Sequence, residues 1–200
     1  MISAPNTVDA DNASNIHVGN AQLASSATSA VQSTDLQYSS SRAVSYANAF
    51  VHNNNPYFYS TTLNCTNFVS QAVSYRFGST TGYSSPTSFR MVSGTYTSGW
   101  FAGSGGGSGP WENVTRNWDY MISGKVNLNG PRVNVTNWAG LLDGGVVQID
   151  FNSDGRFDHS AICVNRASGI FAQNTQNTYR FHQEYIGPKR YYNPSFFRVH

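Results

Sequence analysis

The chain has 200 residues, which suits one domain of ordinary size with a sizeable hydrophobic core. Twelve Lys and Arg against ten Asp and Glu leave a net charge of +2, too weak for a general nucleic-acid or membrane-surface footprint. Only 11% of the residues are charged, and no apolar run is long enough to span a membrane.

Residues 1–35 are rich in small polar residues, with no sustained periodicity and no aromatic side chain. We interpret them as a flexible N-terminal tail, linker or pro-segment, and we expect the folded domain over residues 36–200. A first helix is predicted to begin at Ser40 or Ser41, either of which can cap it. It should end before the Asn-Asn-Asn-Pro run at 53–56, because Pro disfavours a helical residue before it.

The stretch 64–71, Asn-Cys-Thr-Asn-Phe-Val-Ser-Gln, places one of two cysteines in the first turn of a second amphipathic helix. The apolar residues recur with helical spacing at Phe68, Val69, Ala72 and Val73. Asn64 can act as the N-cap, and Gly78 is expected to close the helix. A thiol at a helix N-terminus feels the positive end of the helix dipole, which favours the nucleophilic thiolate. The alternative is a small buried Cys that serves as a core hydrophobe.

Residues 79–109 are rich in Ser, Thr and Gly, and we predict a long loop there. A third helix is predicted from Pro110 to about Ile122, because Pro suits the first turn and the apolar residues that follow form one stripe. Short runs rich in β-branched and aromatic residues then predict strands. These runs cover residues 146–151, 160–164, 170–175 and 191–199. Helices first and strands afterwards predict an α+β fold, with the Cys65 helix packed on a mainly antiparallel sheet.

A catalytic Cys needs a base, and His is the usual choice. Among five His residues, His159 alone opens an apolar strand, where a helix N-terminus could meet it at the rim of the sheet. A structural His at the sheet edge is the alternative. A third polar side chain should orient the imidazole, and the next predicted strand ends with Gln173 and Asn174. Because the side chains of a strand alternate between its faces, only one of these two can serve.

The segment 150–158 has oxygen ligands at the spacing of the first half of a calcium loop, with Gly155 at its sharp turn. The candidate ligands are Asp150, Asn152, Asp154 and Asp158. Position 12 of such a loop would be Ala161 rather than Glu, which excludes a full EF-hand. The alternatives are a β-hairpin turn and a structural calcium ion that braces the strand of His159. No cofactor is expected to be required.

The octad at Cys65 resembles the signature of the putative amidase domain family (amidase-6-like). These are papain-like cysteine hydrolases, mainly bacterial and distantly similar to NlpC-type cell-wall peptidases. Other parts of the chain are similar to the family in the same order, namely residues 43–47, 111–120, 146–150, 154–155 and 158–162. The resemblance covers about residues 37–199. It implies a papain-like fold with Cys65 as nucleophile and His159 as base.

The chain departs from the family pattern at three positions. The third polar residue of the family, often a His after a Gln, falls on Asn174. Asn64 stands where many relatives have Asp, and Gly145 stands where Asp is common after Gly. Because of the first departure, the residue expected to orient the imidazole of His159 is Asn174 or, alternatively, Gln173.

We therefore predict a cysteine-dependent hydrolase of amide or peptide bonds that works through a thioester. Its expected substrates are peptides, peptidoglycan or small amides, with no nucleic-acid or membrane partner, and we expect a monomer. The weakly charged, polar composition is common in secreted bacterial proteins, so we expect a secreted or cell-surface location, although no signal peptide is visible in this chain. The alternatives are a catalytically silent binding or cell-wall module of the same fold and an acyltransferase that uses the same thioester.

Overall fold

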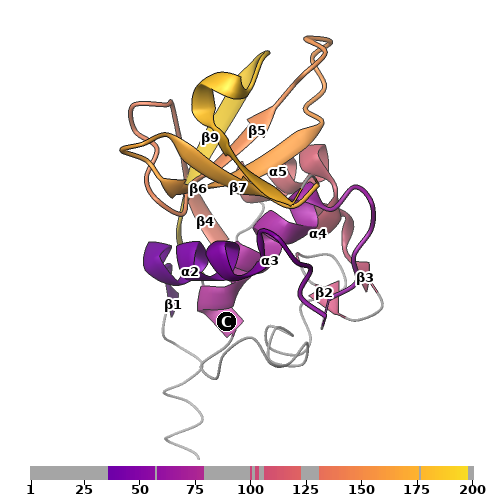
Figure 1. The fold of residues 1–200 in the computed structure, drawn as a ribbon. Coiled ribbons are helices and arrows are strands. Elements are labelled where there is room, and N and C mark those ends of the chain that lie inside the picture. The colour runs from indigo at the N-terminus through magenta and orange to yellow at the C-terminus, as the bar shows by residue number, and fades with distance from the viewer. Residues whose placement is uncertain are drawn as a thin grey trace, which may run out of the picture. The chain divides into compact units, whose positions relative to one another are not determined.

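The computed structural model describes residues 36–56, 58–78, 100, 102–103, 106–122, 131–175 and 177–197 (Figure 1). The predicted tail over residues 1–35 and most of the predicted 79–109 loop lie outside these residues. The domain boundary at residue 36 therefore stays a prediction.

Four helices occur in the described part of the chain: α2 (Ser40–Phe50), α3 (Cys65–Gly78), α4 (Gly109–Glu112) and α5 (Val114–Ile122). The first two are confirmed at their predicted positions. The predicted third helix is broken at Asn113, which has an extended backbone with φ −102° and ψ 130°. The Asn113 side-chain oxygen accepts the Arg116 N–H at 3.0 Å, so this residue ends α4 and caps α5. None of the helices described is both long and apolar enough to cross a membrane.

The main sheet is built from seven strands within the described residues, and each neighbouring pair is antiparallel. Its order is β1-β9-β5-β6-β7-β8, and β4 pairs with the other edge of β9. The strands are β1 (Leu36–Gln37), β4 (Pro131–Thr136), β5 (Val146–Ile149), β6 (His159–Asn165), β7 (Ile170–Gln173), β8 (Thr178–Phe181) and β9 (Lys189–Phe197). A separate two-stranded sheet pairs β2 (Ala102–Gly103) with β3 (Gly106–Gly107), and a short 3₁₀ helix covers His182–Glu184. These elements confirm the α+β class and the antiparallel sheet.

The two faces of the central strands belong to two different hydrophobic clusters. Ile162 of β6 and Ala172 of β7 pack with α2 and α3, on the face that these helices cover in Figure 1. Ala161, Cys163 and Phe171 point to the opposite face and pack with Tyr185 and Tyr191, among others. Both faces are buried, so β5 has four consecutive buried residues in place of the alternation of a half-exposed strand.

A tight turn leads into β5, and it contains Gly145, one of the three positions where the chain departs from the family pattern. An ideal Cβ at Gly145 would lie 2.5 Å from Leu141 Cδ1 and 2.6 Å from Asn193 Oδ1, so no side chain fits there. The Asn193 oxygen accepts the Leu142 N–H at 3.0 Å, and its amide nitrogen donates to the Gly140 carbonyl at 2.9 Å. Asn193 of β9 thus braces the turn from the neighbouring strand.

Candidate active site

Cys65 is the first residue of α3 and is 7% exposed. The Asn64 carbonyl accepts the Phe68 N–H at 2.9 Å, which closes the first turn of the helix. The next residue, Thr66, is joined to Ser160 of β6 by a 3.0 Å hydrogen bond between their hydroxyls. This buried contact holds the N-terminus of α3 against the beginning of β6.

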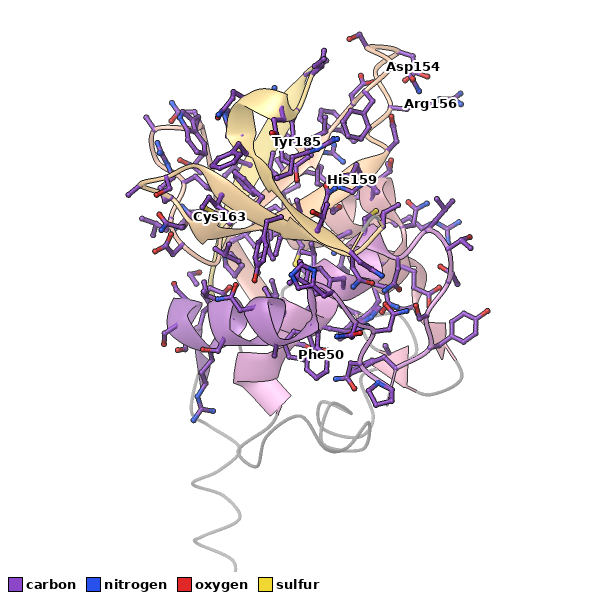
Figure 2. The ribbon with its side chains drawn as sticks, viewed as in Figure 1. Phe50, Asp154, Arg156, His159, Cys163 and Tyr185 are labelled. Carbon is purple, nitrogen blue, oxygen red and sulfur yellow. The ribbon has the colours of Figure 1, made fainter. Side chains whose placement is uncertain are left out.

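His159 is the first residue of β6, is 6% exposed, and interacts with the Cys65 thiol. Burial raises the pKa of Cys65, but the interactions with His159, with smaller effects from Ser160 and Thr66, lower it to about 7. The N-terminal end of the α3 dipole favours the thiolate in the same direction. The structure therefore brings together the predicted thiol and the predicted base, at the end of the sheet where Figure 2 shows His159.

Gln173, the last residue of β7, is the side chain that holds the His159 ring. Its Oε1 accepts the His159 Nε2–H at 2.6 Å, and the residue is 1% exposed. Because the pair of Cys163 and Phe171 fixes the register of β6 and β7, strand alternation puts His159 and Gln173 on one face of the sheet. We infer that Nδ1 is the ring nitrogen that faces Cys65.

Asn174, the first choice predicted for the residue that orients the imidazole, makes its hydrogen bonds elsewhere. Its side-chain oxygen accepts the Asn64 amide at 2.5 Å, and its own amide donates to the Phe50 carbonyl at 3.1 Å. The hydrogen bond to the imidazole thus comes from the alternative residue, Gln173. Two of the three departures from the family pattern, at 64 and 174, are in direct contact with each other.

A chain of buried amides continues from this contact into the helices. Asn67 Nδ2 donates to Asn64 Oδ1 at 2.7 Å, and Asn67 Oδ1 accepts from Gln71 at 2.9 Å and from the Trp111 indole at 2.6 Å. Gln71 in turn accepts the Tyr46 hydroxyl at 2.6 Å. Sequence reasoning treated Asn64 as a helix cap, and its side chain instead joins β7 to α3.

Two aromatic side chains beside His159 were not identified from the sequence. The Tyr185 hydroxyl donates to the same Gln173 oxygen at 2.9 Å, and its ring centroid lies 6.1 Å from that of His159 (Figure 2). Phe151 is 40% exposed, and its ring centroid lies 5.5 Å from the imidazole. Both residues come from connecting segments, where no periodicity points to a site.

Cys163 lies farther along β6 and has no part in this arrangement (Figure 2). Both cysteines are free, so no disulfide blocks Cys65. Cys163 is fully buried, and burial, with a smaller effect of the Asp143 charge, raises its pKa to about 12. Cys163 is therefore a buried free thiol on the same strand as His159.

The predicted calcium loop closes on its own backbone. Asp150 is 1% exposed, and its two carboxylate oxygens accept the N–H groups of Asp154 at 3.3 Å and Gly155 at 2.9 Å. Asp158 accepts the Phe151 N–H at 3.2 Å, and Figure 2 shows Asp154 at the outer tip of the loop. In the described ranges, no group of three or more His, Cys, Asp or Glu side chains could hold a metal ion. The contacts of Asp150 and Asp158 are those of a turn, in which Asn152 is exposed, and a calcium ion there stays a prediction.

Comparison with known proteins agrees with the resemblance seen in the sequence. The family model described as "Putative amidase domain" matches residues 37–195. The chain is similar to "Uncharacterized protein YhbB" of Bacillus subtilis (strain 168), with 29% identity over 149 residues, which are 74% of this chain and 44% of that protein. The chain therefore spans less than half the length of this relative. No solved structure matches the chain.

Proposed function

Because the chain belongs to the putative amidase domain family, we propose that it is a cysteine-dependent hydrolase of amide bonds. The observation that carries this proposal is the buried Cys65 thiol at the N-terminus of α3, where the interactions with His159 lower its pKa to about 7. We also propose that the fold is papain-like, close to that of NlpC-type peptidases. A Cys-bearing helix against an antiparallel sheet whose strand carries the base supports this assignment.

In the proposed mechanism, the Cys65 thiolate attacks the carbonyl carbon of the substrate amide and forms a tetrahedral intermediate. The His159 imidazolium gives a proton to the amide nitrogen, the C–N bond breaks, and the amine leaves with a thioester on Cys65. His159 then takes a proton from a water molecule, which attacks the thioester and releases the carboxylic acid and the thiol. All protons are carried by His159 and water.

Gln173 acts here as a positioning residue, because it holds the imidazole at Nε2 and leaves Nδ1 for the thiol. The Cys65 N–H belongs to the first turn of α3, where the helix supplies no acceptor for it. It is therefore available to stabilise the negative oxygen of the tetrahedral intermediate, which is the usual role of such a donor.

The proposed substrates are peptides, peptidoglycan stem peptides or small amides outside the cell. The weakly charged composition, common in secreted bacterial proteins, supports this location, with 11% charged residues. Water as the acceptor gives hydrolysis, and an amine as the acceptor would give transfer from the same thioester.

Labelling with a thiol-directed probe tests the proposal. We expect iodoacetamide to label the protein at Cys65, with labelling lost in Cys65→Ala and strongly slowed in His159→Ala. Labelling that survives Cys65→Ala, or that is indifferent to His159→Ala, would exclude a Cys65–His159 nucleophile and favour a binding module.

The substrate class is tested by incubating the protein with muropeptides and with a denatured protein, and by reading the products by mass spectrometry. Cys65→Ala is the matched control, since it removes one sulfur atom. Cleavage of neither substrate by a protein with a reactive Cys65 would exclude both classes. Addition of a small amine separates hydrolysis from transfer, because only transfer adds the mass of the amine to the product.

A further inference from the structure

Gln173 accepts two hydrogen bonds on a single atom. Its Oε1 lies 2.6 Å from His159 Nε2 and 2.9 Å from the Tyr185 hydroxyl. The two donors come from β6 and from the connection between β8 and β9, which are distant in the sequence. The two ends of a glutamine amide differ chemically, because only the oxygen accepts and only the nitrogen donates. The orientation of this amide therefore decides what it can offer to the imidazole.

Rotation of the Gln173 amide by half a turn would change the tautomer of His159. With the oxygen toward the ring, Nε2 must carry the proton and Nδ1 is the basic nitrogen that faces Cys65. With the NH₂ group toward the ring, Nε2 must be unprotonated and Nδ1 carries the proton, so the neutral ring can no longer accept a proton from the thiol. Only the first orientation supports a general base.

Tyr185 favours the first orientation. It is 1% exposed, and burial raises the pKa of its hydroxyl, so the group stays protonated and can donate. Its ring is packed edge-on against Phe171, with centroids 5.8 Å apart and an interplanar angle of 83°. Phe171 precedes Gln173 by two residues on the same face of β7, so the aromatic contact and the hydrogen bond are held together. Rotation of the amide would leave the buried Tyr185 hydroxyl without its acceptor, even after the ring changes tautomer, which is unfavourable.

We propose that Tyr185 is a positioning residue that fixes the amide of Gln173 and thereby selects the Nε2–H tautomer of His159. The catalytic consequence rests on the proposed function, whereas the tautomer itself does not. Tyr185 thus acts on the imidazole through two hydrogen bonds, by way of Gln173.

Nitrogen NMR of the histidine rings in Cys65→Ala protein tests the proposal without any activity measurement. The protein carries ¹⁵N-labelled histidine, the signals of His159 are identified by their loss in His159→Gln, and spectra are recorded at a pH where the ring is neutral. We expect the Nε2–H form to dominate, and Tyr185→Phe to raise the ratio of Nδ1–H to Nε2–H by about tenfold, as the loss of one buried hydrogen bond implies. An unchanged ratio would overturn the proposal.

Tyr191→Phe is the matched control, because Tyr191 also hydrogen-bonds a histidine, His182 Nε2, at 2.8 Å. This variant should leave the His159 signals unchanged, and an equal change of the His159 tautomer in both variants would contradict a specific role of Tyr185. The double variant Tyr185→Phe with Gln173→Glu should restore the Nε2–H form, because both oxygens of a carboxylate accept. Failure of this rescue would show that the tautomer depends on packing and not on the amide orientation.

Reactivity separates this inference from the proposed function. If the proposed function holds, Tyr185→Phe slows alkylation of Cys65 by iodoacetamide about fivefold to tenfold at neutral pH, and Tyr191→Phe does not. A tautomer change with no dependence of the alkylation rate on His159 would remove the hydrolase mechanism and leave the role of Tyr185 intact. An alkylation rate that depends on His159, together with an unchanged tautomer in Tyr185→Phe, would leave the hydrolase mechanism intact and remove the role of Tyr185.

Discussion

Replacement of His159 by Gln should move the ionisation of the Cys65 thiol by about two pH units. Gln can still donate a hydrogen bond toward Gln173, so the substitution removes the base and its charge with little change of shape. Burial, the largest effect on the pKa of Cys65, raises it, and the interactions with His159 are the main ones that lower it to about 7 from its ordinary value of 9.0. Without His159, we expect the pKa to return to about 9 or higher.

The expected rates follow from these values. At pH 7 about half of Cys65 is thiolate in the native protein, because its pKa is about 7. In the variant about 1% is thiolate, which is a loss of about fiftyfold. A thiolate of higher pKa is more nucleophilic by roughly sixfold to tenfold over two units, so the net fall of the alkylation rate at pH 7 is only about fivefold to tenfold. The midpoint of the pH profile is therefore the more informative quantity.

The assay is the rate of iodoacetamide alkylation of Cys65 between pH 5 and about pH 10, read by mass spectrometry of the intact protein. We expect a midpoint near 7 in the native protein, near 9 or above in His159→Gln, and near 7 in the control His182→Gln. Cys163 should not contribute below pH 10, because it is fully buried and its pKa is raised to about 12. A native midpoint near 9, or one that His159→Gln does not move, would refute the reasoning.

Three further predictions concern residues outside the pair of Cys65 and His159. Gln173→Leu should lower the alkylation rate at neutral pH by up to about fivefold, because it leaves the His159 N–H and the Tyr185 hydroxyl unpaired. Asn174→Leu should mainly lower the melting temperature, which calorimetry measures alongside the rate. An equal effect of both variants on the rate would contradict the distinct roles of these two residues. Gly145→Ala should destabilise the protein by about 1–3 kcal/mol, measured by urea unfolding, because its Cβ would overlap with Leu141 and Asn193, and an unchanged midpoint would show that the turn relaxes. Calcium at millimolar concentration should leave the melting temperature unchanged, because Asp150 already accepts two backbone N–H groups, and a clear rise that EDTA reverses would contradict this view of the loop.

Asn64 and Asn174, two of the positions where the chain departs from the family pattern, are hydrogen-bonded to each other. Many relatives carry Asp at the first position, and a His often stands at the second. In this chain the two side chains meet as neutral amides at 2.5 Å. The pair joins the end of β7 to the beginning of α3. The last residue of β7, Gln173, binds His159, and the residue after it, Asn174, binds the residue before Cys65.

Local sequence predicted most of the elements and singled out Cys65 and His159. The helical spacing after Cys65 and the apolar run after His159 were sufficient to predict α3 and β6. Burial of one helix face requires apolar residues at helical spacing, and burial of both strand faces requires an unbroken apolar run. The break of the third helix at Asn113 was missed, since an Asn inside an apolar stripe becomes a cap only when the chain turns there. β4 and β8 were not singled out, and the exposed side chains that alternate along β8 carry a weaker signal than a buried run.

Tertiary structure decided which polar groups meet. From the sequence, Asn174 was the first choice for the third residue and Gln173 the alternative. The strand pattern could not decide between them, because they differ by one position and a shift of one residue in strand register exchanges the two faces. The pairing of Cys163 with Phe171 sets that register, and it places Gln173 on the His159 face and Asn174 on the helix face. Tyr185 reaches Gln173 from a distant connection, so no local pattern could predict the hydrogen bond. The sequence by itself determined that Cys65 and His159 are the candidates for the site, and only the packed sheet determined which side chain holds the imidazole.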